Sequence, residues 1–231
     1  MLWKGSPKQL LIMGTIIMNT KAETAKEMLS SKEHKVHEIK FKRFFDVSAS
    51  ISIILMIWPL MLCIALAIKL NSPGPVFFKQ RRRGKHLKEF EIYKFRSMKV
   101  HIENGNVTQA KKNDPRVTAV GKIIRKTSLD ELPQFINVLL GDMSIVGPRP
   151  HAIEHDRYYE KLIPHYNDRY LVKPGITGLA QISGFRGETS TLNEMEQRIV
   201  KDIEYVQRCS FIEDLKIFLM TPIMLMRGNN Y

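Results

Sequence analysis

The sequence predicts a mainly helical α+β protein, in which a re-entrant membrane helix hairpin is joined to a small cytoplasmic domain with a short β-hairpin and interfacial amphipathic helices. Three observations predict this fold. Residues 47–68 contain no charged side chain, which is typical of a segment buried in lipid. Two short runs of aromatic and β-branched residues follow, separated by a polar segment with glycine, and they indicate a β-hairpin. Much of the remaining chain shows helical periodicity of its apolar residues.

The strongly basic composition limits the classes of partner. The 231 residues include 36 Lys and Arg against 23 Asp and Glu, a net charge of +13, so the surface attracts anions such as nucleic acid, anionic lipid or phosphorylated substrates. No nucleic-acid-binding motif occurs, and basic residues gather beside the apolar segment, which argues against nucleic acid. Cys63 and Cys209 form no metal-binding or disulfide pattern, and a reducing cytosol fits them best.

The chain is predicted to have three parts. Residues 1–38 are rich in Lys, Glu, Ser and Thr and are expected to be a variable leader. Residues 39–71 are expected to form the membrane hairpin. A dense turn segment at 71–75 marks the start of the cytoplasmic domain, residues 72–231.

The membrane segment is predicted to enter the bilayer and return to the same side. A straight helix over 47–68 would be about 33 Å long, close to the hydrocarbon thickness, but Pro59 near its middle is expected to break or kink it. Basic residues flank both ends, and the positive-inside rule then favours the cytoplasm for both. They are Lys40, Lys42 and Arg43 before the segment, and Lys69, Lys79 and 81–83 after it. The alternative is an ordinary transmembrane helix that tolerates the proline.

The cytoplasmic domain is predicted to mix one hairpin with several helices. In chain order the elements are strands at 76–79 and 90–96 around a turn at 81–89, a flexible loop at 99–116, and helices at 117–125, 129–140 and around 192–206. The helix around 192–206 is amphipathic. The last helix, 211–226, is apolar and interrupted by Pro222, so we expect it to lie at the membrane interface beside the hairpin.

The adjacent carboxylates Asp130 and Glu131 are the strongest candidates for catalysis. Ser128 followed three residues later by Glu131 predicts a capping box that starts a helix near Leu129. Both acids would then lie in the first turn, beside Arg125. This arrangement can supply a nucleophile, the magnesium ligands Asp130 and Glu131, and phosphate neutralisation within one turn. The alternative is ordinary helix capping by acidic residues.

Three further basic residues are candidates for phosphate binding. Arg149 stands between two prolines, so its guanidinium loses little conformational freedom when it binds a phosphate with two hydrogen bonds. Lys94 and Arg96 have the spacing of residues on one face of a strand. The alternatives are a surface arginine in a proline turn and a solvated strand edge. Residues 81–83 are three arginines that suit anionic lipid headgroups better than the active site.

Four motifs in order resemble the bacterial sugar transferase family, the monotopic polyprenyl-phosphate phosphoglycosyl transferases. They are SPGPVFFKQRRRG, YKFRSM, DPRVTAVGKIIRKTSLDELPQFINVLLGDMSIVGPRP and KPGITGLAQISG. The likeness runs from about Lys42 to the C-terminus. The resemblance implies a re-entrant helix, dependence on magnesium, and a covalent phosphosugar intermediate on Asp130, with Glu131 as its acidic partner near the metal. It also implies phosphate binding by Arg125 and Arg149, and it places Lys94 at a basic position of the family. Trp58 stands before the proline where the family usually has serine.

The reaction implied by the resemblance is transfer of hexose-1-phosphate from a UDP-sugar, UDP-glucose or UDP-galactose, to undecaprenyl phosphate. UMP is released, and the product starts exopolysaccharide or capsule synthesis at the bacterial inner (cytoplasmic) membrane, with the catalytic domain on the cytoplasmic face. Membrane lipids are expected partners, and a homo-oligomer remains open. One alternative is a non-catalytic, membrane-tethered scaffold that binds anionic lipid. Another is an enzyme that transfers the sugar phosphate directly in a ternary complex.

Overall fold

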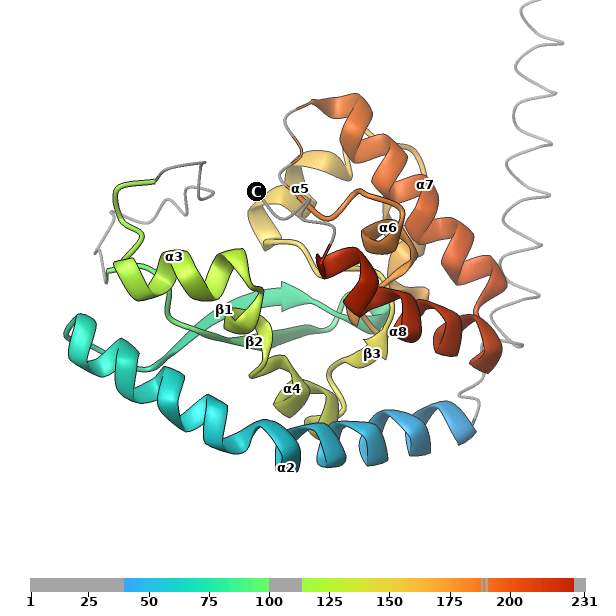
Figure 1. Cartoon of the computed structure of the whole chain (residues 1–231). Coiled ribbons are helices and arrows are strands. Elements are labelled where there is room, and N and C mark those ends of the chain that lie inside the picture. Colours follow the sequence, from blue (N-terminus) through green and yellow to red (C-terminus); the bar gives the residue numbers. More distant parts are fainter. Residues whose placement is uncertain (1–39, 100–113, 188, 190, 227–231) are drawn as a thin grey trace, which may run out of the picture. The chain divides into compact units, whose positions relative to one another are not determined.

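The computed structural model describes residues 40–99, 114–187, 189 and 191–226. The predicted leader, 1–38, and residues 100–113 of the predicted loop at 99–116 lie outside the described residues. The fold is mainly helical with small sheets (Figure 1), so the predicted α+β class is confirmed. In chain order the elements are α2 Lys40–Asn71, β1 Phe77–Arg83, η1 Lys85–Leu87, β2 Glu89–Phe95, α3 Ala119–Lys126, η2 Leu129–Glu131, α4 Gln134–Leu140, β3 Ser144–Val146, α5 Ile153–Tyr159, η3 Tyr166–Leu171, β4 Gly175–Thr177, α6 Leu179–Ile182, α7 Leu192–Arg208 and α8 Phe211–Met226.

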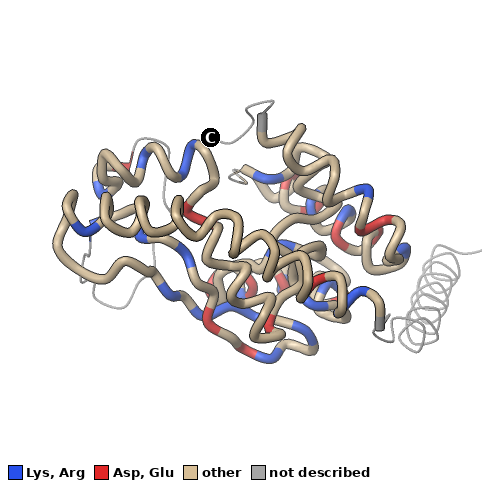
Figure 2. The backbone as a smooth tube through the Cα atoms, turned by 60° about the horizontal axis from the view of Figure 1, so that its bottom comes forward, with Lys and Arg blue, Asp and Glu red and all other residues tan. Residues whose placement is uncertain are grey.

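The long apolar segment forms one helix, α2, of 32 residues with Pro59 inside it. The sequence predicted two helices with a break between them, whereas the helix continues through the proline. A proline removes one hydrogen bond and bends a helix without necessarily ending it, and Figure 1 shows α2 bent. The helix is long and apolar enough to cross a membrane, and only 11% of its most apolar stretch is buried within the protein. Figure 2 shows this long stretch of α2 without charged residues.

Both ends of α2 are attached to the same domain. Near its N-terminus, Arg43 donates hydrogen bonds of 2.6 and 3.0 Å to two carbonyl oxygens in the last turn of α4. The Asp46 carboxylate accepts a hydrogen bond of 3.0 Å from a backbone N–H of β3. Near the C-terminus of the helix, Ile64 and Ile68 are buried in a cluster with Phe95 of β2. The helix therefore runs along one side of the domain.

The strands form two separate pairs. β1 and β2 are antiparallel, from Phe77 opposite Phe95 to Arg83 opposite Glu89, which confirms the predicted hairpin. The first strand is longer than predicted, because residues 81–83, expected in the turn, pair with residues 89–91 of β2. Arg83 at its end also forms an ion pair with Glu160, with an N–O distance of 2.6 Å. The second pair, β3 and β4, is parallel and was not predicted.

The C-terminal helices follow the sequence pattern closely. Thr191 and Glu194 form a reciprocal capping box at the start of α7, and Met195 and Ile199 on its apolar stripe are each 1% exposed. The predicted amphipathic helix is therefore confirmed. α8 is a single apolar helix with Pro222 inside it.

Candidate active site

The turn that carries Asp130 and Glu131 is a short 3-10 helix rather than the first turn of an α-helix. Ser128 adopts the left-handed conformation with φ 57°, and its side chain makes no capping hydrogen bond. The predicted capping box at Ser128 is therefore wrong, and the α-helix starts only at Gln134. The physical reason is that the Glu131 carboxylate binds cations from other elements instead of the start of its own helix.

Glu131 is held by three cations. The Lys94 ammonium on β2 lies 2.9 Å from its Oε1. Arg149 donates from both terminal nitrogens, at 3.1 Å to Oε2 and in a second, shorter bond to Oε1. Arg186 donates to Oε2 at 3.3 Å. Burial opposes ionisation of Glu131, but Arg149 and Lys94 outweigh it, so the pKa of this carboxyl lies well below its usual value.

The pKa of Asp130 is shifted in the opposite direction from that of Glu131. Burial raises the pKa of its carboxyl to about 6, and the neighbouring charge of Glu131 adds to the rise, while Lys94, Arg149 and Arg125 act against it. Within the described part of the chain, the Asp130 carboxylate takes part in no hydrogen bond or ion pair. At neutral pH it is therefore mostly ionised, with oxygens available to a reacting group.

Arg149 and the pair β3–β4 are held by two loops whose backbones pass very close to each other. The Gly147 N–H donates to the Thr177 carbonyl, and the Gly175 N–H donates to the Pro148 carbonyl, both at 2.9 Å. A Cβ added to Gly147 would lie 2.4 Å from a backbone oxygen, so no other residue fits there without moving the loops. The glycines in the two motifs thus fix the position from which Arg149 reaches Glu131.

Not all of the predicted site residues lie beside the Asp130–Glu131 pair. Lys94 and Arg149 contact Glu131, and the charge of Arg125 at the end of α3 acts on Asp130. Arg96 does not lie with them. Its side chain is buried and donates hydrogen bonds to the carbonyl oxygens of residues 72 and 73, the first at 2.7 Å. The prediction for Arg96 is thereby corrected, because β2 ends before it and its side chain is used to hold the connection after α2.

Arg186 is a site residue that sequence reasoning missed. It lies in the loop after α6 and reaches Glu131 across 55 positions of the chain. Its only sequence signal is its place two residues after the glycine that ends the segment KPGITGLAQISG. No local spacing relates it to Glu131.

Comparison with known proteins decides the family. The model of the family described as bacterial sugar transferase matches residues 37–228. This chain belongs to the bacterial sugar transferase family.

Several relatives have names that state an activity. The chain is 57% identical over 180 residues to a UDP-glucose:undecaprenyl-phosphate glucose-1-phosphate transferase of Escherichia coli, covering 78% of this chain and 39% of that protein. It is 52% identical over 186 residues to the protein of the same name from Xanthomonas campestris, covering 80% and 38%. It is 46% identical over 199 residues to an exopolysaccharide production protein of Rhizobium leguminosarum, covering 84% and 100%. The chain thus spans about two fifths of the length of the first two relatives.

The side chains at the candidate site of this sugar transferase can be compared with the ligands that magnesium requires. The described residues contain no group of three or more His, Cys, Asp or Glu side chains that could hold a metal ion. Magnesium, however, is commonly held by one or two carboxylates together with substrate phosphates. Asp130 fits such a role, since its oxygens have no partner in the described residues. Glu131, predicted as a second ligand, would first have to release cations that already bind both of its oxygens.

Proposed function

We propose that this bacterial sugar transferase moves hexose-1-phosphate from a UDP-sugar, with UDP-glucose favoured, to undecaprenyl phosphate. UMP is released, and Asp130 carries a covalent phosphosugar between the two steps. The observation that carries the proposal is the pair of adjacent carboxylates, in which Glu131 is neutralised by three cations and Asp130 has no partner among the described residues. The names of the similar proteins from E. coli and Xanthomonas support the donor and the acceptor.

In the first step the ionised Asp130 carboxylate attacks the β-phosphorus of the donor. The bond between this phosphorus and the bridging oxygen breaks, and UMP leaves with the electron pair. Lys94, Arg149 and Arg186 lie around Glu131. Their positive charge there offsets the negative charge of the diphosphate and of the transition state. Glu131 acts by holding these cations in place before the substrate arrives.

In the second step the phosphate oxygen of the polyprenyl phosphate attacks the same phosphorus. The aspartyl bond breaks, Asp130 is restored as a carboxylate, and the sugar diphosphate lipid leaves. Asp130 would hold magnesium together with substrate phosphates, and the ion would supply further neutralisation of the diphosphate charge.

The same proposal includes a membrane anchor that enters and leaves the bilayer on one side, at the cytoplasmic face of the inner membrane. The support is that both ends of α2 contact one domain, Arg43 through α4 and Ile68 through β2. A helix that crossed the bilayer would place these ends on opposite sides of the hydrocarbon. The anchor would hold Asp130 at the depth of lipid headgroups, where the acceptor phosphate lies.

The deciding experiment is intact-protein mass spectrometry of the purified chain mixed with magnesium and a panel of UDP-hexoses, without lipid acceptor. We expect an adduct of hexose-phosphate mass, lost in Asp130→Asn and retained in Glu196→Gln, an acid-to-amide control on α7. Adding undecaprenyl phosphate should remove the adduct. Release of UMP only when both substrates are present, with no adduct, would support direct transfer in a ternary complex. Vesicle binding without UMP release from any donor would support the scaffold.

A further inference from the structure

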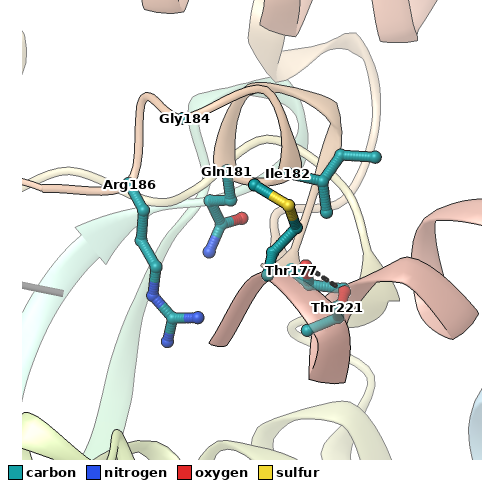
Figure 3. Close-up of a pocket in the computed structure, with 7 residues that line it drawn as sticks. Thr177, Gln181, Ile182, Gly184, Arg186 and Thr221 are labelled. Atoms are coloured by element: carbon teal, nitrogen blue, oxygen red, sulfur yellow. Dashed lines mark hydrogen bonds between the residues drawn. The ribbon is translucent and has the colours of Figure 1, made fainter. Parts of the chain in front are cut away.

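A pocket lies between α6 and α8 and is connected to the active site through one side chain. Its lining includes Thr177, Gln181, Ile182, Arg186, Thr221 and Met224. Figure 3 shows the side chains of Arg186 and Gln181 extending into the same space, with Thr177 and Thr221 at its other side. Arg186 also donates to Glu131. The pocket is therefore one arginine side chain away from Glu131, the neighbour of the proposed nucleophile Asp130.

The polar groups of the pocket are a mixture of donors and acceptors. The Thr221 hydroxyl donates to the carbonyl of Ile217, so the Thr177 hydroxyl donates to Thr221, and their oxygens are 2.8 Å apart. The Thr177 oxygen is thereby left as an acceptor. Gln181 uses one N–H for the carbonyl of Ile176, and its buried Oε1 has no hydrogen-bond partner among the described residues. Such a lining fits a group with several hydroxyls, because each hydroxyl both donates and accepts.

The lining argues against a nucleobase. None of the seven described residues that line the pocket is aromatic, so a flat base would have no ring to stack on. The Ile182 and Met224 side chains supply an apolar edge of the kind that packs against the C–H groups of a sugar ring.

The chemistry of the reaction indicates which part of the donor stays in one place. In phosphoryl transfer the attacking and leaving oxygens lie roughly in line. UMP must leave the position opposite Asp130, and the lipid phosphate must then enter it. The hexosyl oxygen remains bonded to the phosphorus in both steps. A fixed subsite that is joined to the carboxylate pair through Arg186 and stays occupied in both steps therefore suits the hexosyl group best.

We infer that this pocket binds the hexosyl group of the donor through its hydroxyls and contributes to the choice of sugar. The inference rests on the proposed transfer reaction. Gln181 and Thr177 are the residues that contact the sugar, while Arg186 joins the sugar subsite to the phosphate site.

The test compares donors with UDP, which has the same uridine and diphosphate but no hexose. The full chain in lipid nanodiscs is assayed for UMP release from UDP-glucose and UDP-galactose, for inhibition by UDP, and for equilibrium binding of UDP-glucose and UDP without lipid acceptor. For Gln181→Met and Thr177→Val we expect kcat/KM with the preferred donor to fall about 10-fold. The preference between the two hexoses should shrink, and the inhibition constant of UDP should change less than about 2-fold. Thr177→Ser, which keeps the hydroxyl, should lose less kcat/KM than Thr177→Val. Gln207→Met, an exposed control on α7, should behave as wild type.

Each other outcome overturns the inference in a recognisable way. Equal losses for UDP and UDP-glucose would assign the pocket to the nucleoside. A change confined to the KM of the lipid would assign it to the acceptor, and unchanged kinetics in both variants would exclude a substrate site. If Gln181→Met fails to fold, the pair Thr177→Val and Thr177→Ser decides. If the wild type releases no UMP, the proposed function fails, and the binding of UDP-glucose against UDP by the same variants still tests the pocket.

Discussion

At the scale of single residues, two adjacent carboxylates differ because of what surrounds them. Burial disfavours the charge of both, yet only Glu131 is contacted directly by Lys94, Arg149 and Arg186. Its pKa is lowered, while that of Asp130 is raised to about 6. One carboxylate is thus suited to hold cations and the other to react.

The pH dependence of the first step should report the pKa of Asp130. Attack requires the ionised carboxylate, so the rate should rise with pH through about 6. Lys94 lowers this pKa, and its loss in Lys94→Met should move the midpoint to higher pH. The rate at pH 8 should also fall by about 100-fold, because the phosphates lose a cation. UMP release measured from pH 5 to 9 checks both effects.

Lys79→Met is the control for this series. Lys79 is also a strand lysine, but it is about half exposed and forms a 3.4 Å ion pair with Glu91 on the surface. Its variant should keep the wild-type midpoint. An unchanged midpoint in Lys94→Met would show that Lys94 does not act on the group that titrates.

Asp130→Asn should stabilise the fold above pH 6. The folded pKa of about 6 is higher than the ordinary 3.8, so the ionised form is disfavoured by folding. The cost is absent below pH 3.8, grows between the two values, and reaches at most about 3 kcal/mol above pH 6. Thermal unfolding in detergent should therefore give a higher Tm for Asp130→Asn than for wild type at pH 8 and an equal Tm near pH 4. A difference of the same size at both values would contradict this account.

The sequence predicted the site residues that lie within recognisable motifs. It missed the residue that reaches the site only through a tertiary contact. Asp130, Glu131, Lys94 and Arg149 are brought together as expected. Arg186 could not be found, because its relation to Glu131 depends on how the loop after α6 folds back. The alternation rule placed the arginine of the YKFRSM motif beside Lys94, but the strand ends before that arginine.

At the scale of elements, one buried side chain joins β2 to α4. The Asn137 amide accepts a hydrogen bond of 2.9 Å from the Tyr93 N–H and donates one of 2.7 Å to the Glu91 carbonyl. It thus takes the place of a neighbouring strand at the free edge of β2. Lys94 follows Tyr93 directly, and Glu131 lies just before α4. The contact therefore sets the distance between Lys94 and Glu131.

Asn137→Leu should loosen this connection. It leaves the Tyr93 N–H and the Glu91 carbonyl, which are partly buried at this contact, without their partner, which costs at most about 1–3 kcal/mol for each group. We expect a lower Tm and, because Lys94 is less well placed, a pH midpoint displaced in the same direction as in Lys94→Met. Asn193→Leu, an exposed change on α7, should alter neither. A lower Tm with the wild-type pH midpoint would reduce Asn137 to a purely structural role.

The elements themselves show where local patterns suffice. The stripe and capping box of α7 agree with the sequence, because Thr191 and Glu194 satisfy each other within one turn. The same pattern at Ser128 fails, since three cations compete for the glutamate. The pair β3–β4 was not predicted, because each strand has only three residues and its partner is distant in the chain.

At the scale of the whole molecule, the attachment of both ends of α2 predicts a one-sided topology. Phe41 and Leu70 lie near the two ends of the helix and are 74% and 88% exposed. In a background with Cys63→Ser and Cys209→Ser, single cysteines at these two positions should resist a membrane-impermeant maleimide in intact spheroplasts. Both should react after permeabilisation. Labelling of one position in intact cells would support an ordinary transmembrane helix.

Lys42 gives the anchor a part in assembly. Its ammonium donates to the Val146 carbonyl, the Tyr205 hydroxyl and the Asp214 carboxylate, which belong to segments that leave the ribosome long after α2. Because α2 is synthesised before these partners, we expect it to provide the surface on which they dock. A truncated fragment beginning after Asn71 would lack Lys42 and would leave the buried Tyr205 and Asp214 without this cation. Efforts to obtain a water-soluble enzyme by trimming the anchor should therefore yield aggregates.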